Sequence, residues 1–273
     1  HLNRVIQTVC QRYMERIRMP SCSAVLGVDV GWSVNRKSSA VCKIHWDNAE
    51  VKFISECFSA TEENISSVLP KYSKGTLCAA AFDGPVRGNL DQIGIYRCAE
   101  KILTRKPISS LIGKPGQTNS KNGHYLNHYA NIFAKTVLNN CTVLPSTHEC
   151  AIHEKAIVEA FPTTFLGMMI ENPETIACRR SNRSDRFFQF LSNNGTLESL
   201  LQELLPSKDL KTSFSTASNH DKRAAVVCAL SALCVTSGKF TAVGDRNGYI
   251  ILPPRKFICE RYWNIISDKA YDY

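Results

Sequence analysis

Two aspartates stand where the surrounding sequence makes a carboxylate costly. Asp29 interrupts the apolar run 24–30, and Asp83 follows a second apolar run, 76–82, directly before a Gly-Pro pair. A buried charge without a partner is strongly unfavourable, so each residue needs a hydrogen bond, a basic side chain or a bound cation. Ligands of open α/β proteins bind where the parallel strands end. We therefore interpret Asp29 and Asp83 together as part of a functional site.

Two further acids are candidates for the same site. Asp221 lies in the first turn of a predicted helix whose interior is almost wholly apolar, and Glu159 lies inside the apolar run 156–161. Simpler explanations remain open, because the helix dipole favours any acid in a first turn and the Asp-Gly-Pro sequence at Asp83 also suits an ordinary turn. Asp245, in a Gly-rich turn, is the weakest candidate.

Converging carboxylates suit hard divalent cations. Mg²⁺ and Mn²⁺ prefer oxygen ligands, and two such ions about 4 Å apart activate a water and stabilise the leaving oxygen of a phosphodiester. Without metal, mutual repulsion raises the pKa of at least one of the carboxyl groups. We expect Asp29, Asp83 and Asp221 to bind the metal, with Glu159 as an additional catalytic acid.

The elements that position these acids follow from the spacing of apolar residues. Apolar runs bounded by turns predict strands, and helical spacing with capping residues predicts helices. The expected fold is α/β, with a five-stranded mixed sheet in which three antiparallel strands precede parallel ones, flanked by helices. Strands are predicted at 24–30, 40–46, 51–58, 76–82 and 156–161. Helices are predicted at 61–74, 91–104 and 219–237, and after Pro162, Ser184 and Thr196.

One domain, residues 21–253, is expected to hold most of the 273 residues, of which 44% are hydrophobic, enough for a substantial core. Residues 1–20 predict a basic amphipathic helix, and residues 254–273 predict a C-terminal extension packed on the domain. Gly, Pro, Ser, Asn and Lys are frequent at 106–127, which predicts a long, mobile, basic loop.

The charge balance indicates a polyanionic partner. The chain has 33 Lys and Arg against 24 Asp and Glu, a formal net charge of +9. Such an excess concentrates polyanions near the surface, so we expect nucleic acid as the partner. The candidate nucleic-acid contacts are Arg87, Lys114, Lys121, Lys222 and Arg223.

Composition also bears on the cellular setting. No apolar run approaches the roughly 20 residues of a membrane span, and the first residues lack the pattern of a secretory signal. The twelve cysteines include no C-x-x-C pair, which favours reduced, mostly buried thiols. We expect a cytoplasmic protein without a membrane partner. Zinc is less favoured, because His124 with His128, and the cluster around His148, lack a complete ligand set.

Six short motifs follow one another along residues 27–253. They are Gly27–Trp32, Ala81–Pro85, Arg97 with Glu100, Val158–Pro162, His220–Ala225 and Gly244–Ile250. Their order resembles an uncharacterised family of predicted ribonuclease-H-like nucleases. The resemblance implies a mixed five-stranded sheet flanked by helices, with Asp29, Asp83 and Asp221 as metal-binding acids and Glu159 as a fourth.

The last helix departs from this family. Relatives usually read Asp-Ala-x-Asp-Ala there, whereas Asp221 is followed by Lys222, Arg223 and two alanines. The second acid is therefore missing. Either the two basic side chains contact phosphate in its place, or a second metal binds poorly.

Two other functions stay open. One is a nucleic-acid-binding or scaffolding module of the same fold that has lost turnover and binds through Lys106, Lys114 and Lys121. The other is an ATP-binding protein similar to actin or sugar kinases, whose strand turn the sequence 27–31 also fits. Those proteins duplicate the fold, and this chain shows no internal repeat.

Overall fold

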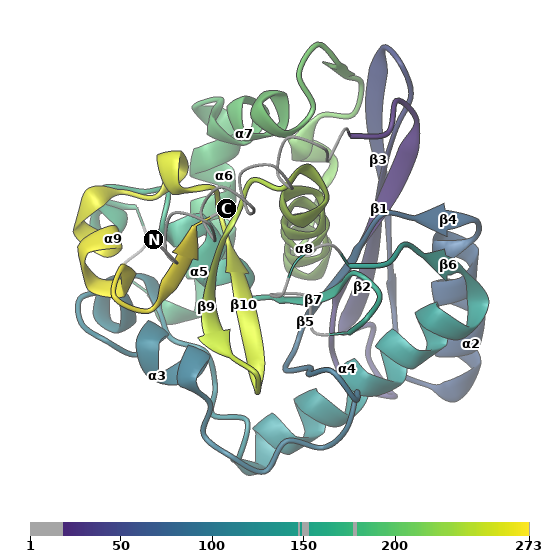
Figure 1. Cartoon of the computed structure of the whole chain (residues 1–273), viewed down its shortest axis with the longest axis horizontal. Coiled ribbons are helices and arrows are strands. Elements are labelled where there is room, and N and C mark those ends of the chain that lie inside the picture. The colour runs from purple at the N-terminus through teal and green to yellow at the C-terminus, as the bar shows by residue number, and fades with distance from the viewer. Residues whose placement is uncertain (1–18, 147, 149–152, 177–178, 273) are drawn as a thin grey trace, which may run out of the picture.

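The computed structural model describes residues 19–146, 148, 153–176 and 179–272, and it has an α/β architecture built on one large mixed sheet (Figure 1). Within these residues the sheet contains nine strands, in the order β11-β9-β10-β7-β5-β1-β2-β3-β8. The prediction of an α/β fold with a mixed sheet is confirmed, but the predicted number of five strands was wrong. Almost all of the predicted N-terminal helix lies outside the described residues.

The five predicted strands form the contiguous centre of this sheet. β1 is antiparallel to β2 and β2 to β3, whereas β1, β5 and β7 are parallel neighbours. β1, β5 and β7 are buried along almost their whole length, as strands covered on both faces are. Their bounds are β1 Ser23–Asp29, β2 Ser39–Trp46, β3 Glu50–Phe58, β5 Ala80–Asp83 and β7 Ile157–Ala160.

Four short strands extend the centre at its two edges. β10 (Gly248–Leu252) pairs in parallel with β7, and β9 (Thr241–Asp245) and β11 (Ala270–Asp272) follow by antiparallel pairing. β8 (Asp209–Leu210) pairs with the start of β3. These strands satisfy backbone groups that sheet edges would otherwise expose. The Gly-rich segment interpreted as a turn connects β9 to β10, and the strands on either side of it were not predicted.

The helix α8 (His220–Ser237) packs on one face of the sheet and was predicted to the residue at its C-terminus. The Asn219 side chain accepts a hydrogen bond from Lys222 N, and Gly238 ends the helix with a left-handed φ of 69°. Gly27 of β1 has no room for a side chain, because a Cβ there would lie 2.1 Å from Ala229 N. This glycine lets the helix and the strand approach at backbone distance.

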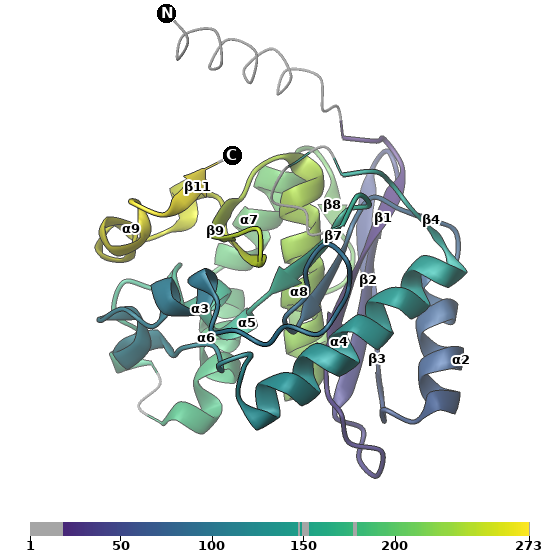
Figure 2. The same cartoon turned by 60° about the horizontal axis from the view of Figure 1, so that its bottom comes forward.

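The opposite face of the sheet is covered by α2 and α4, as the edge-on view shows (Figure 2). A separate pair of short parallel strands, β4 (Thr76–Leu77) and β6 (Thr142–Val143), lies beside them (Figure 1). The other helices are α2 Glu62–Ser73, α3 Cys98–Leu103, α4 Lys121–Asn140, α5 Pro162–Gly167, α6 Arg183–Asn193, α7 Thr196–Leu204 and α9 Glu260–Ile266. Single turns lie at Ile108–Ile112, Pro173–Thr175, Arg180–Asn182, Phe214–Thr216 and Arg255–Phe257.

The predicted loop 106–127 was wrong in its second part, because α4 begins at Lys121 and continues for 20 residues. Polar residues of this segment fix the position of α4 through hydrogen bonds. Ser120 accepts a hydrogen bond from the N–H of Gly123 and caps the helix. The buried side chain of Asn127 accepts from Ile93 N at 2.9 Å and donates to Pro85 O at 2.7 Å, which fixes the chain after β5.

The predicted helix 91–104 was too long, since only Cys98–Leu103 is α-helical. The C-terminal residues 254–272 contribute α9 and β11, and β11 completes the sheet beside β9. In the described part of the chain, no helix is both long and apolar enough to cross a bilayer.

Candidate metal centre

Asp29 and Asp83 occupy matching positions at the ends of two adjacent strands. They are register partners in the parallel pair β1 and β5, whose chains lie about 4.8 Å apart. Side chains alternate between faces along a strand, so Asp29 shares a face with Gly27, which contacts α8. Both carboxylates therefore start from neighbouring positions on the α8 face of the sheet.

Asp221 lies near Asp29 and Asp83, in the helix α8 that packs on this face of the sheet. It lies half-buried in the first turn of α8, and its charge, with that of Asp83, acts on Asp29. The N-cap Asn219 and the close packing at Gly27 set where this first turn lies relative to β1. The structure thus brings together the three acids that the sequence singled out.

In the absence of a cation, the surroundings of the three acids raise the pKa of each of them. Burial, with repulsion from Asp83 and Asp221, raises the pKa of Asp29 well above its ordinary value. Burial raises the pKa of Asp83 to about 7, with a contribution from the charge of Glu159. Burial also raises the pKa of Asp221, although His220 opposes the shift. A bound cation would oppose these shifts, because its charge stabilises the ionised carboxylates.

The carboxylates of Asp29 and Asp83 suit Mg²⁺ or Mn²⁺ better than a metal whose ligands must all come from protein side chains. Among the described residues, no three Asp, Glu, His or Cys side chains stand close enough to form a complete ligand group. Mg²⁺ usually keeps several waters and binds through one or two carboxylates. Asp29 and Asp83, as register partners at adjacent strand ends, are the pair of carboxylates that could supply such ligands.

Glu159 lies on the other side of the sheet from the aspartates. It is the register partner of Phe82, the neighbour of Asp83, so alternation directs it away from the α8 face. Its Oε2 and Oε1 accept hydrogen bonds from Arg97 Nη1 at 2.6 Å and Nη2 at 2.8 Å. The prediction that Glu159 is a fourth acid of the site gains no support from this position.

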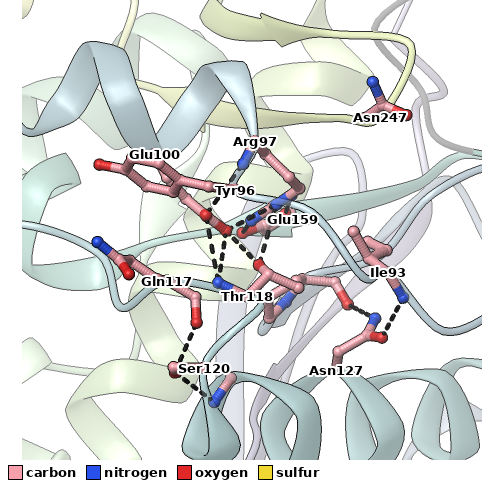
Figure 3. A network of polar contacts seen from close by, with 12 residues as sticks. Ile93, Tyr96, Arg97, Glu100, Gln117, Thr118, Ser120, Asn127, Glu159 and Asn247 are labelled. Atoms are coloured by element: carbon pink, nitrogen blue, oxygen red, sulfur yellow. Dashed lines mark hydrogen bonds and ion pairs between the residues drawn. The ribbon is translucent and has the colours of Figure 1, made fainter.

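Arg97 is the centre of a buried ionic network that includes Glu159 (Figure 3). Its side chain is 1% exposed, and Nε donates to Glu100 Oε1 at 2.8 Å and to Thr118 Oγ1 at 3.1 Å. Burial lowers the pKa of Arg97, but the charges and hydrogen bonds of both glutamates outweigh it and hold the guanidinium ionised. Gly248 of β10 leaves no room for a Cβ, which would lie 2.6 Å from Arg97 Nη1.

Two of the five predicted nucleic-acid contacts are engaged within the protein. Arg87 Nε donates to Asp91 Oδ1 at 2.6 Å, and Arg223 Nη1 donates to Asp185 Oδ1 at 3.0 Å. Arg223 Nε also donates to the backbone carbonyl of Ala217. Arg87 therefore stabilises the loop after β5, and Arg223 links the start of α8 to α6 and to the preceding segment.

The other three predicted contacts differ in exposure. Lys114 and Lys121 are exposed, and Lys222 is half-exposed next to Asp221. His124 and His128, weighed as zinc ligands, are exposed on α4. Lys222 is the basic side chain nearest in sequence to the three acids.

Sequence reasoning missed two charged residues beside the three acids. Asp185, in the first turn of α6, lies 3.4 Å from His220 Nδ1 through its Oδ2 and binds Arg223 through Oδ1. Arg36, between β1 and β2, exerts an attractive charge on Asp221. Both stand in polar segments without a buried run, so only their contacts distinguish them from ordinary surface residues.

Comparisons with known proteins found no relative, so any assignment of function depends on the geometry described above. No family model, curated protein or solved structure matches the chain. The resemblance to ribonuclease-H-like nucleases, which rests on motif order, stays a prediction.

Proposed function

We propose that this protein is a divalent-metal-dependent nuclease with a ribonuclease-H-like core, cutting phosphodiester bonds of DNA or RNA. The observation that carries the proposal is the register pairing of Asp29 with Asp83 on the face that α8 covers, with Asp221 in the first turn of that helix. The order β7-β5-β1-β2-β3, with β1, β2 and β3 antiparallel, is the arrangement expected for such a core.

In this proposal each acid and each nearby basic residue has a separate role in the reaction. Asp29 and Asp83 would hold the cation at the ends of β1 and β5, and Asp221 would accept a hydrogen bond from the attacking water. Mg²⁺ or Mn²⁺, when bound, lowers the pKa of that water and stabilises the leaving oxygen. Lys222 and Arg36 place positive charge beside the acids, where a phosphate must approach.

The missing second acid of α8 favours one alternative, a nucleic-acid-binding module with little or no turnover. Asp221 is followed by Lys222 and Arg223, and Arg223 is bound to Asp185. The third acid thus has no acidic neighbour on its helix to complete a second metal site. The ATP-binding alternative has less support, since the described residues form one large sheet and no duplicate of it.

A cleavage assay separates these functions. Purified protein is incubated with labelled single-stranded and duplex DNA and RNA in Mn²⁺, in Mg²⁺ and in chelator. We expect cleavage of at least one substrate in Mn²⁺ or Mg²⁺ and none in chelator. Binding that weakens steeply with salt but gives no cleavage in either metal would contradict the nuclease and support the binding module.

A further inference from the structure

The connection between β1 and β2, residues 30–38, presents an aromatic side chain and two cations directly after Asp29. This segment projects from the lower edge of the sheet in Figure 2. Trp32 is 40% exposed and Val34 is 50% exposed, although both are apolar. Arg36 and Lys37 are exposed in the same loop, and neither forms an ion pair with a described residue. We call residues 30–38 the Trp32 loop.

Hydrogen bonds within the Trp32 loop and to the neighbouring Ser39 and Ala60 order its backbone. Ser39 Oγ accepts from Gly31 N at 3.0 Å and donates to Gly31 O at 3.2 Å. Ala60 N donates to Ser33 O at 2.8 Å, and Arg36 N donates to Ser33 Oγ at 3.1 Å. A loop that is already ordered loses little conformational entropy when it binds a ligand.

The other two tryptophans have partners that account for their positions. Trp46 is buried and donates its Nε1–H to Pro20 O at 2.8 Å. The ring of Trp263 is covered by the Arg255 guanidinium, 4.5 Å from its centroid. Trp32 has no such ring or cation among the described residues, so its exposed indole is left for an external partner.

The chemistry around Trp32 suits a nucleic acid strand as that partner. Aromatic side chains bind single strands by stacking on unpaired bases, and neighbouring cations contact the phosphates between them. Arg36 and Lys37 supply those cations, in a chain of net charge +9. The paired bases of a duplex are stacked on one another, so a duplex offers no base face to this indole.

We propose that Trp32 stacks on an unpaired nucleobase while Arg36 and Lys37 contact the adjacent phosphates, so that the site takes single-stranded nucleic acid. The proposal deepens the nuclease function, on which it rests for the fate of the bound strand. Because Trp32 follows Asp29 by three residues, the stacked nucleotide lies beside the acids and sets which phosphodiester meets the cation.

Equilibrium binding in chelator tests this proposal without cleavage. Fluorescence anisotropy compares a labelled single-stranded oligonucleotide with its duplex, for the wild type, Trp32→Ala and Trp32→Phe. We expect tighter binding of the single strand, a loss of about 10- to 100-fold in Trp32→Ala, and near wild-type binding in Trp32→Phe, which keeps a stacking ring. Duplex binding should change little, and the melting temperature should change little because the Trp32 ring has no ring or cation contact with a described residue.

The results that would contradict the role of Trp32 differ from those that would contradict the nuclease function. Equal binding of single strand by Trp32→Ala and wild type, or a preference for duplex that persists in all three proteins, would overturn the role of Trp32 even if cleavage is observed. Binding that depends on Trp32 without cleavage in any metal would support the role of Trp32 and overturn the nuclease.

Discussion

Replacing Asp29 by asparagine is expected to lower the rate of metal-dependent cleavage about a thousandfold. A metal ion contributes several kcal/mol of charge stabilisation in the transition state, and each 1.36 kcal/mol corresponds to about tenfold in rate. Asparagine keeps the size of the side chain but lacks the negative charge that would hold the cation between Asp29 and Asp83. The measurement is the single-turnover rate on a labelled oligonucleotide in Mn²⁺.

A matched control for this variant is Asp209→Asn, which removes an exposed acid from β8. It should cleave at the wild-type rate. Asp29→Asn should also remain folded and be at least as stable as the metal-free wild type, because burial and repulsion disfavour the Asp29 carboxylate. Cleavage by Asp29→Asn at the rate of Asp209→Asn would remove Asp29 from the mechanism.

Replacing Arg97 by methionine is expected to lower the free energy of unfolding by about 3–5 kcal/mol. Removing one partner of a buried ion pair leaves the other charge without compensation, and that is its main cost. Here two buried carboxylates, Glu100 and Glu159, would both lose their cation. Methionine has a similar length, so the change tests charge rather than volume. Urea unfolding measures the difference.

The control for Arg97→Met is Arg87→Met, which breaks an exposed pair with Asp91 on the surface. Exposed ion pairs contribute about 1 kcal/mol or less. We expect Arg97→Met to lose clearly more stability than Arg87→Met. Equal losses of stability would mean that the buried network does not hold α3 against the sheet.

The three candidate acids could be singled out from the sequence because Asp29 and Asp83 end apolar runs and Asp221 lies in the first turn of a helix with an apolar interior. Asp29 and Asp83 end runs that are buried almost throughout, and Asp221 follows an N-cap at the start of a helix that is buried nearly all round. A carboxylate in such surroundings is conspicuous in the sequence. Register pairing of the two strands then places Asp29 beside Asp83, which the sequence could only suggest.

Glu159 also interrupts an apolar run, yet it occupies the opposite face of the sheet from Asp83. An apolar run does not reveal which face of the sheet a residue occupies, because strands buried on both faces lack alternation. The register of Phe82 with Glu159 decides the face, and it directs Glu159 to Arg97. The pairing of distant strands is tertiary information.

The helix α4 and the edge strands were missed for a different reason. Residues 121–127 include Gly123 and Asn127, which read as loop residues, but both have tertiary roles. Gly123 lies where a Cβ would be 2.1 Å from Gln117 O, and Asn127 bonds to the backbone of two loop residues. The spacing of Ala130, Phe133, Ala134 and Val137, all buried, was the helical signal that local composition hid.

The pH dependence of stability, with and without Mn²⁺, tests most directly whether the aspartates form a cation site. The pKa of Asp83 is about 7 in the folded protein and about 3.9 when unfolded. Its protonated form therefore contributes stability that is fully present below about pH 4 and is lost as pH rises through about 7. Asp29 and Asp221 shift in the same direction.

Melting temperatures of wild type, Asp83→Asn and Asp209→Asn would be recorded from about pH 5 to pH 8, in chelator and in Mn²⁺. In chelator, wild type should lose more stability than Asp83→Asn as pH rises. Mn²⁺ should raise the melting temperature of wild type and Asp209→Asn at pH 8 and much less at pH 5, where protons compete, and should have little effect on Asp83→Asn. Equal stabilisation of Asp83→Asn and wild type by Mn²⁺, or none in wild type at pH 8, would contradict a cation site at these aspartates.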